Sequence, residues 1–259
     1  MNKKIITSAQ NSLIKEIKEL QSKKSKRKKE GLFVIEGIRG VKEIPKNIKL
    51  KYLVTTEDIN VEQIEGINAN TWIEVSKDIY KTISDTQSPQ GAMAVAEIPS
   101  VTLNTITNKK GQYLMLENLQ DPGNLGTIIR TAHAFGFDAL LITKGSVDVY
   151  SPKVVRSTMG ALFGLPIVID EEAETYVSHL KEMKITLYTT ALKEDAINIH
   201  DVKFDKGRAI VIGNEGNGVS DYVISEADYA VMISMPGGAE SLNASVAAGI
   251  CMYESMLQK

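Results

Sequence analysis

The sequence predicts an α/β protein made of two parts, a small N-terminal unit and a larger C-terminal unit whose sheet is mainly parallel. Three observations predict this. Short apolar runs alternate with stretches of helical spacing along the chain. A polar, turn-rich stretch at 99–111 separates two such series. Beyond it, several apolar runs are continuous, which is typical of a parallel sheet covered on both faces.

The composition fits a globular protein and excludes several classes. The chain has 259 residues, 43% of them hydrophobic and 24% charged, enough to bury a core. The one cysteine, Cys251, excludes an intramolecular disulfide and a cysteine-based zinc site, and the three histidines lack ligand-like spacing. No apolar run of signal-peptide or membrane-spanning type is present. We therefore expect a cytoplasmic protein with no metal and no membrane partner.

Basic residues are concentrated at the N-terminus. Residues 1–31 carry ten Lys and Arg against three Glu, a local charge of +7 in a chain of net charge −2. Leu13, Ile17 and Leu20 repeat at helical spacing before the densest run, so a short amphipathic helix is expected to present it. The run fits either an anionic partner or a solvated tail. Its members are Lys23, Lys24, Lys26, Arg27, Lys28 and Lys29.

The N-terminal unit is predicted to span 1–98, with 99–111 as a linker. Four apolar runs read as strands, and helical stretches fit between them. The strands are expected at 32–35, 51–55, 72–75 and 92–96.

The C-terminal unit is predicted to span 112–259. Its strands are expected at 113–116, 139–143, 167–169, 185–190, 209–212 and 230–233. Its helices are expected at 124–135, 152–159, 172–183 and 243–257.

Three strand-to-loop junctions of this unit carry chemistry. In the first, a Pro-Gly turn follows the strand 113–116 and a helix begins near Asn124, which can cap it. Arg130 lies about 200° around this helix from Ile128, so it should point away from the core. The residues expected to face the core are Leu125, Ile128, Ile129, Ala132 and Phe135.

The second junction follows the strand 209–212 and holds three glycines within six residues, 213–218. Its backbone can turn sharply and approach a ligand closely, and Glu215 is expected to be buried there. Glu215 also breaks the Gly-x-Gly-x-x-Gly pattern, and no Gly-Lys-Ser/Thr follows, so neither a dinucleotide loop nor a Walker loop is supported.

The third junction runs from the strand 230–233 through Pro236-Gly237-Gly238 into the helix 243–257. Ser241 or Asn243 can cap this helix. The small residues Ala244, Ala247 and Ala248 allow a close approach of another backbone.

Together, in this order and spacing, the junctions resemble the SpoU (TrmH-like) family of RNA ribose 2′-O-methyltransferases. The matching residues are Asn124, Gly126 and Arg130 of the first motif, Gly213, Glu215 and Gly218 of the second, and Ser241, Leu242 and Asn243 of the third. More weakly, 1–98 resembles the L30e-like α/β/α substrate-binding domain often fused in front, whose cue here is Phe33-Val34-Ile35-Glu36-Gly37.

The resemblance implies a C-terminal α/β-knot domain with a deep trefoil knot, S-adenosylmethionine as cofactor, and a homodimer with active sites at its interface. It implies catalytic roles for Arg130, Asn124, Glu215, Ser241 and Asn243, the last four orienting Arg130 and the ribose. The implied cofactor contacts are Thr190, Ala191, Gly213, Asn214, Gly218, Ile233, Met235 and Leu242. The basic run would contact RNA, and Ala247, Ala248 and Tyr253 are the expected dimer contacts.

The expected reaction is methylation of a ribose 2′-hydroxyl in structured RNA, first of all 23S ribosomal RNA. Since a guanidinium stays protonated, Arg130 is expected to act as an electrostatic clamp on phosphate and developing alkoxide rather than as a base. The alternatives are a tRNA 2′-O-methyltransferase, a non-catalytic L30e-like RNA-binding protein, and a nucleotide-dependent oxidoreductase. The last lacks its glycine-rich first turn.

Overall fold

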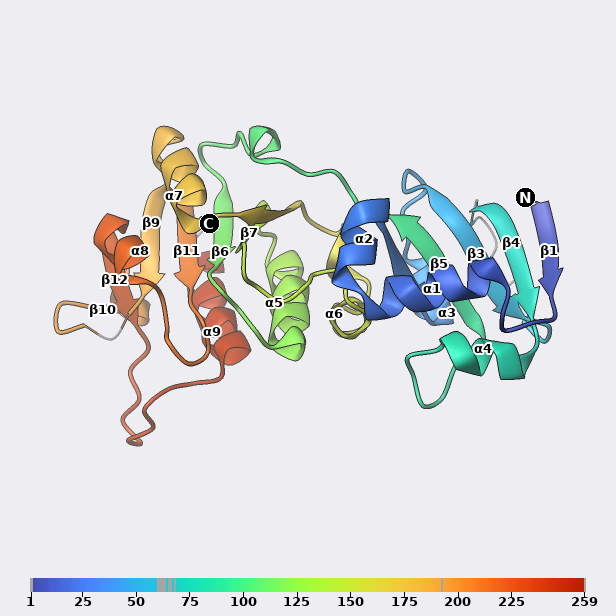
Figure 1. Cartoon of the computed structure of the whole chain (residues 1–259). Helices are drawn as coiled ribbons and strands as arrows, with labels where there is room; N and C mark the ends of the chain where they lie inside the picture. Colours follow the sequence, from blue (N-terminus) through green and yellow to red (C-terminus); the bar gives the residue numbers. More distant parts are fainter. Residues whose placement is uncertain (1, 60–63, 65–66, 68, 192, 259) are drawn as a thin grey trace. The chain divides into compact units, whose positions relative to one another are not determined.

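The structure is a computed structural model that describes residues 2–59, 64, 67, 69–191 and 193–258 (Figure 1). It divides into two compact units. The N-terminal unit holds 1–100 together with 148–163, and the C-terminal unit holds 101–147 and 164–259. This division differs from the sequence prediction in two places. Residues 148–163, predicted in the C-terminal domain, belong to the N-terminal unit, and most of the predicted linker, 101–111, belongs to the C-terminal unit.

The C-terminal unit is built on a seven-stranded parallel sheet. Its strands are β6 (Gln112–Leu116), β7 (Ala139–Thr143), β8 (Ile167–Glu171), β9 (Thr186–Thr190), β10 (Ile197–Asn198), β11 (Arg208–Ile212) and β12 (Tyr229–Met232). They lie in the order β10-β12-β9-β11-β6-β7-β8, and each pair is parallel. The chain thus runs outward from β6 through β7 and β8, then returns to build the other half of the sheet.

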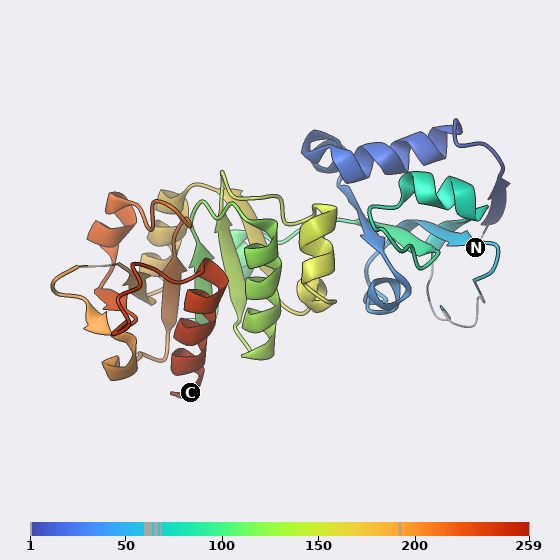
Figure 2. The ribbon, with the colours of Figure 1, turned by 90° about the horizontal axis from the view of Figure 1, so that it is seen from below.

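Helices cover both faces of this sheet. Helices α5 (Pro122–Ala134) and α9 (Ala244–Met256) lie side by side on one face (Figures 1 and 2). Helices α7 (Ala173–Glu182) and α8 (Asp221–Glu226) share a core with alternate strand residues such as Met115 and Val211 on the other. Double coverage is the reason that β6, β7 and β11 are buried along their whole length.

The N-terminal unit holds a mixed five-stranded sheet. Its strands are β1 (Asn2–Ile6), β2 (Leu32–Glu36), β3 (Leu50–Thr56), β4 (Ala69–Val75) and β5 (Ala92–Glu97), in the order β1-β4-β3-β5-β2. Its helices are α1 (Ser12–Ser22), α2 (Lys24–Glu30), α3 (Ile38–Lys42), α4 (Lys77–Ile83) and α6 (Pro152–Ser157). α1 and α4 bury Ile17 and Tyr80 in one core with Val34 and Val54 of the sheet.

The α/β class and the mainly parallel C-terminal sheet are confirmed, and every predicted strand and helix is present with its ends shifted by at most a few residues. Among the short elements of the described residues that the sequence did not predict are β1, β10 and α8. In β1 the pattern is hidden because it is an edge strand, and Lys3 pairs with Glu74 instead of being buried. None of the described helices is long and apolar enough to cross a membrane. The knot implied by the resemblance stays a prediction.

Candidate active site

The three motifs meet at one edge of the C-terminal sheet. β6 and β11 are neighbouring strands. The chain continues from β6 toward one edge of the sheet and from β11 toward the other. β9 lies beside β11, and β12 lies beside β9. Thr190 is the last residue of β9, and Ile233 directly follows β12. Because all these strands are parallel, their carboxyl ends share an edge. Open α/β sheets bind ligands at such a switch point.

Helix α5 begins earlier than the sequence suggests. Its N-cap is Asp121, whose side chain accepts a hydrogen bond from the Asn124 N–H at 2.8 Å, and Pro122 occupies the first turn. The expected capping role of Asn124 is therefore wrong. Its side chain is instead free to bond elsewhere, and it is almost completely buried.

The side chains of Asn243, Asn124 and Glu215 form one chain of hydrogen bonds. Asn243 Nδ2 donates to Asn124 Oδ1 at 2.9 Å, and Asn124 Nδ2 donates to Glu215 Oε1 at 3.1 Å. A carboxylate only accepts, so Glu215 fixes which end of the Asn124 amide faces it, and the opposite end then requires a donor at 243. One residue from each motif is thereby held in a fixed orientation.

Glu215 also holds the loop that precedes α5. Its two carboxylate oxygens accept the backbone N–H groups of Gln120 and Asp121, each at 3.0 Å. Desolvation raises the pKa of Glu215, but the bonds from Asp121, Asn124 and Gln120 together lower it below its ordinary value. The residue is exposed rather than buried, contrary to expectation. It is an ionised acceptor that positions a loop, not a proton acceptor tuned to neutral pH.

The glycine loop 213–218 folds back on itself. Asn214 and Gly218 pair through their backbones, and Asn214 Oδ1 accepts the N–H groups of Gly216 and Asn217. A Cβ on Gly213 would meet the Gly218 carbonyl carbon at 2.1 Å. The glycine at 213 is thus required by the loop's own closure, not only by the approach of a ligand. Asn214 Nδ2 ties the loop to the Asn118 carbonyl at 2.8 Å.

The loop between β12 and α9 is largely exposed. Asn243 caps α9, since its Oδ1 accepts the N–H groups of Ser245 and Val246 while its Nδ2 reaches Asn124. Ser241 is exposed and is not part of this network. Leu242 is 37% exposed, and Ile233 and Met235 are half-buried.

The remaining predicted cofactor residues serve the sheet. Thr190 Oγ1 donates to the Val211 carbonyl at 3.0 Å, and the Ala191 N–H donates to the Val231 carbonyl at 3.1 Å. Both bonds lie where β9, β11 and β12 end, so the backbone there is held beside the other two loops.

Arg130 is exposed on α5, as its position around the helix predicts. Of the predicted inward residues, Leu125, Ile128, Ile129 and Ala132 are fully buried, and Phe135 is half-buried. Within the described part of the chain, Arg130 has no hydrogen bond or ion pair. The idea that Asn124, Glu215, Ser241 and Asn243 orient it directly is therefore not supported within one chain. Arg130 lies six residues, about 9 Å, further along α5 than Asn124.

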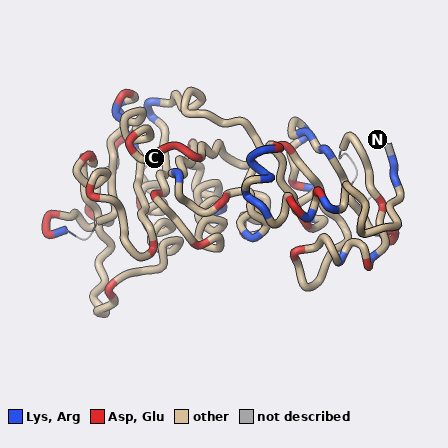
Figure 3. The backbone as a smooth tube through the Cα atoms, viewed as in Figure 1, with Lys and Arg blue, Asp and Glu red and all other residues tan. Residues whose placement is uncertain are grey.

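The basic run forms α2 and its approach, and Lys and Arg gather there in Figure 3. Lys23, Lys24, Lys28 and Lys29 are exposed, and Lys26 is half-buried beside Glu30 and Glu19. Arg27 differs, because it is only 5% exposed and its guanidinium bonds Asp148 and the carbonyls of Leu20 and Gln21. It must be removed from the set of candidate RNA contacts.

Sequence reasoning missed four residues of the loop after β6. Glu117 is buried and accepts the Ser220 N–H at 2.9 Å, Asn118 has a left-handed φ of 52°, and Gln120 and Asp121 bond Glu215. The sequence signal for them is the run Glu-Asn-Leu-Gln-Asp, which places four polar residues directly after a buried strand and before the Pro-Gly turn.

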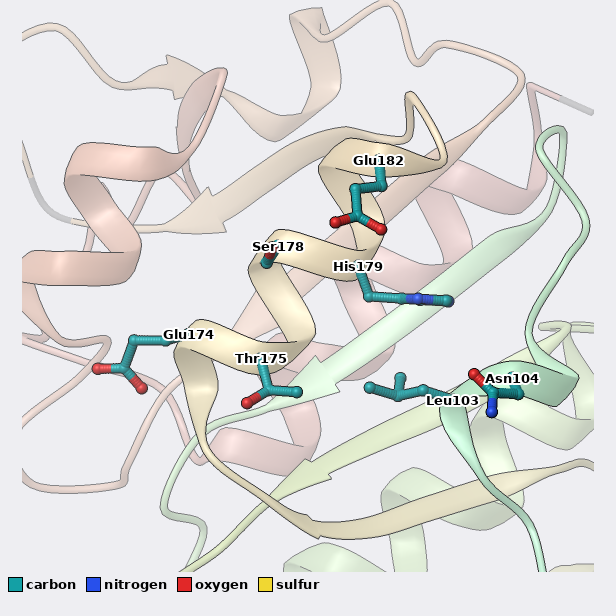
Figure 4. Close-up of a pocket in the computed structure, with 7 residues that line it drawn as sticks. All are labelled: Leu103, Asn104, Glu174, Thr175, Ser178, His179 and Glu182. Atoms are coloured by element: carbon teal, nitrogen blue, oxygen red, sulfur yellow. The ribbon is translucent and has the colours of Figure 1, made fainter.

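An open depression elsewhere in the C-terminal unit holds none of these residues. It lies between α7 and the turn at Leu103–Thr105 (Figure 4). Its lining residues are Leu103, Asn104, Glu174, Thr175, Ser178, His179 and Glu182. His179 is bonded to the Ile106 carbonyl at 3.0 Å, so the histidine anchors the segment that enters β6.

Comparison with known proteins identifies relatives along nearly the whole chain. The SpoU rRNA Methylase family model matches residues 111–253, and the MRM3-like substrate binding domain model matches 11–94. A Bacillus subtilis relative, "23S rRNA (guanosine(2553)-2′-O)-methyltransferase RlmP", is 36% identical over 96% of this chain and 98% of its own length.

Two solved structures resemble the whole chain. An AdoMet-bound rRNA methyltransferase from Sinorhizobium meliloti has a TM-score of 0.88 at 29% identity, covering 98% of this chain and 97% of that one. The SpoU methyltransferase AviRb from Streptomyces viridochromogenes, in complex with AdoMet, has a TM-score of 0.88 at 27% identity and covers 96% and 98%. With its three motifs joined at one sheet edge, the chain belongs to the SpoU rRNA methylase family and carries an MRM3-like substrate-binding domain in front.

Proposed function

We propose that this chain transfers a methyl group from S-adenosylmethionine to a ribose 2′-hydroxyl of ribosomal RNA, in the first place 23S rRNA. The observation that carries the proposal is the chain Asn243–Asn124–Glu215, which joins the three motifs where the sheet changes direction. The 23S target is supported by the 23S rRNA methyltransferase that is similar over the whole chain.

The strand ends fit the proposed cofactor. Leu242, Ile233 and Met235 retain exposed apolar surface in the loop after β12, which suits an adenine ring. A Cβ on Gly237 or Gly238 would meet no atom of the described residues within 4 Å, so the backbone of that loop is open to a ligand. When bound, S-adenosylmethionine supplies a methyl group on a positively charged sulfur.

The chain's own residues bind and orient. The network of Glu215, Asn124 and Asn243 keeps the strand-end loops in one arrangement before substrate arrives, which lowers the cost of alignment. Arg130 presents a permanent positive charge to the RNA phosphate and to the oxygen that loses its proton. A phosphate oxygen or a water molecule receives that proton.

A homodimer completes the proposal. Val246 and Tyr253 of α9 and Leu257, its C-cap, are 47–58% exposed, and their spacing places them within about 40° of one another around the helix. Ala248, an expected contact, is fully buried in the chain's own core, so this apolar stripe replaces it. Arg130 is exposed on α5, which packs beside α9, the helix that carries this stripe. Tyr253→Glu should give monomers in sedimentation velocity and abolish methyl transfer; active monomers would refute the dimer.

Two measurements test the activity. S-adenosylmethionine should raise the melting temperature of the native protein, and NAD should not, because only a ligand of the folded state stabilises it. Unmodified 23S rRNA should then accept label from a methyl-labelled cofactor at one ribose, whereas tRNA should not. A shift with NAD alone would point to an oxidoreductase, and a shift with neither would leave only an RNA-binding module. Localisation to the cytoplasm stays a prediction.

A further inference from the structure

The Phe33–Gly37 motif of the N-terminal unit has a second partner besides its own sheet. Side chains along β2 alternate, so Val34 faces the core made with α1 and α4, and Phe33 and Ile35 face the other side. Both are buried, Phe33 completely. Something other than α1 and α4 must therefore cover this second face.

Part of the cover comes from α3, since a Cβ on its Gly40 would meet the Ile35 side chain at 3.1 Å, and part comes from a segment far along the chain. Residues 148–163, here called the crossover arm, are part of the connection between the parallel strands β7 and β8. The arm includes α6, which packs against β2. Its apolar side chains are buried in the N-terminal unit: Val149, Tyr150, Val154, Val155, Ala161 and Leu162. The second face is thus closed by α3 together with a segment from the connection between β7 and β8.

Two residues of the motif link β2 to the crossover arm, Phe33 directly and Glu36 through the turn at 84–86. The Phe33 ring lies 4.8 Å from the ring of Tyr150 and 6.2 Å from that of Phe163, distances typical of tilted aromatic pairs. Glu36 accepts hydrogen bonds from Ser84, Thr86 and the Asp85 N–H, and the turn so fixed presents the Asp85 carboxylate to Arg156 of α6.

The basic helix α2 supplies the third contact. Arg27 Nε donates to Asp148 Oδ2 at 2.8 Å, and the pair is nearly buried, with side chains 6% and 14% exposed. Asp148 is the first residue of the arm. Its neighbour Val147 is bonded within the C-terminal unit, donating to the Leu119 carbonyl at 2.8 Å, and Gln120 of the same loop bonds Glu215. Val147 and Asp148 are thus the residues at which the chain passes from the C-terminal unit into the arm.

We propose that Arg27 and Phe33 are positioning residues that dock the crossover arm, so that the RNA-binding unit is completed by the methyltransferase chain rather than joined to it by a linker alone. Arg27 thus fixes the place of the arm, while the exposed lysines beside it contact RNA. Removal of residues 1–98 would leave the arm's apolar side chains uncovered, so the shortened chain would not be a simple cofactor-binding module.

Hydrogen exchange on the full chain tests the docking. The Val155 and Thr158 amides, which are bonded within α6, should be protected in the wild-type protein. Arg27→Met and Phe33→Ala should increase their exchange by about tenfold or more and leave β7 and β8 unchanged, because local opening reports local contacts. Lys29→Met is the matched control, since it removes the same charge from α2 without touching Asp148.

The arm can also be altered from its own side. If Arg27→Met fails to fold, Asp148→Asn removes the partner charge while leaving α2 intact. Selective loss of arm protection in Asp148→Asn supports docking. Unchanged arm protection in that variant, or equal loss throughout the N-terminal unit, overturns it.

A kinetic measurement tests positioning and rests on the proposed function. Asp148→Asn should lower kcat for RNA methylation by about tenfold or more and change the RNA KM less than about threefold, because misplaced reactants cost rate rather than affinity. Lys29→Met should do the reverse. The opposite split would overturn positioning. If even the wild-type protein methylates no RNA, the proposed function fails, and hydrogen exchange still decides the docking.

Discussion

Helices α5 and α2 each carry an arginine that the sequence nominates for RNA, and the structure treats the two in opposite ways. Arg130 on α5 is exposed and, in the described residues, has no bonded partner. Arg27 on α2 is buried and makes four hydrogen-bond contacts, two of them to Asp148. Arg130 is therefore available to a substrate, whereas the guanidinium of Arg27 is occupied by contacts within the fold.

The difference teaches that local charge density does not identify a binding residue. The run around Arg27 is the most basic in the chain, while Arg130 stands alone on an otherwise ordinary helix. What separates them is one carboxylate 121 residues away from Arg27. A buried cation requires such a partner, because desolvation of an unpaired charge is too costly.

The largest expected effect is at Arg130. Arg130→Ala should lower methyl transfer on the order of 100-fold or more, since it removes a preorganised charge from the reacting oxygen. Stability should change by roughly 0.5 kcal/mol or less, because the side chain is exposed. Single-turnover methylation and thermal melting measure the two.

Arg130→Lys sharpens the assignment. It keeps the charge and loses the planar fork, so it should restore little activity. A folded Arg130→Ala protein with near-normal methylation would remove Arg130 from the mechanism. If Arg130→Ala does not fold, Arg130 has a structural role as Arg27 does, and the contrast between the two arginines is wrong.

The hydrogen-bond chain should be next in size. Asn243→Ala loses both the α9 cap, worth roughly 1 kcal/mol, and the donor to Asn124. Asn243→Asp keeps the capping oxygen and loses only the donor, so it should melt closer to wild type. Methylation by both variants should fall by about tenfold, as expected when a positioned group shifts. Normal activity of Asn243→Asp would show that the orientation of Asn124 does not matter.

A smaller effect separates the members of the basic run. Lys24→Met or Lys29→Met should each reduce the salt dependence of RNA binding by about 0.7–0.9 in the slope of log K against log salt, one phosphate contact each. Arg27→Met should leave that slope unchanged, because its guanidinium is buried against Asp148. Titrations at several salt concentrations measure the slopes, and equal slopes for all three variants would contradict the division of roles.

The smallest effect concerns Glu215. The pKa of Glu215 is lower in the folded protein than in the unfolded chain, so its ionisation stabilises the fold at any pH above the unfolded-state pKa. This stabilisation is lost as the pH falls through the folded-state pKa. The stability difference between wild type and Glu215→Gln should stay constant from pH 8 to about 5 and shrink below about pH 4. Urea melts across this range measure it. A difference that shrinks near pH 7 would instead mean a raised pKa.

The sequence by itself determined the local elements and the family. Apolar runs marked the strands of the parallel sheet, helical spacing buried Leu125 and Ile128 and exposed Arg130, and three motifs identified a SpoU methyltransferase with S-adenosylmethionine as its cofactor. These features depend on neighbours within a few residues, where periodicity and turn chemistry are sufficient.

Only the tertiary structure decided which partners the polar residues take. Whether Asn124 caps α5 or bonds Glu215 depends on a strand order that joins residues 91 apart, and Asp121 takes the cap. Whether Arg27 meets RNA or Asp148 depends on a crossover that leaves one sheet to cover another. Sequence spacing carries no record of such pairings, because they arise when distant strand ends and loops are brought to a common edge.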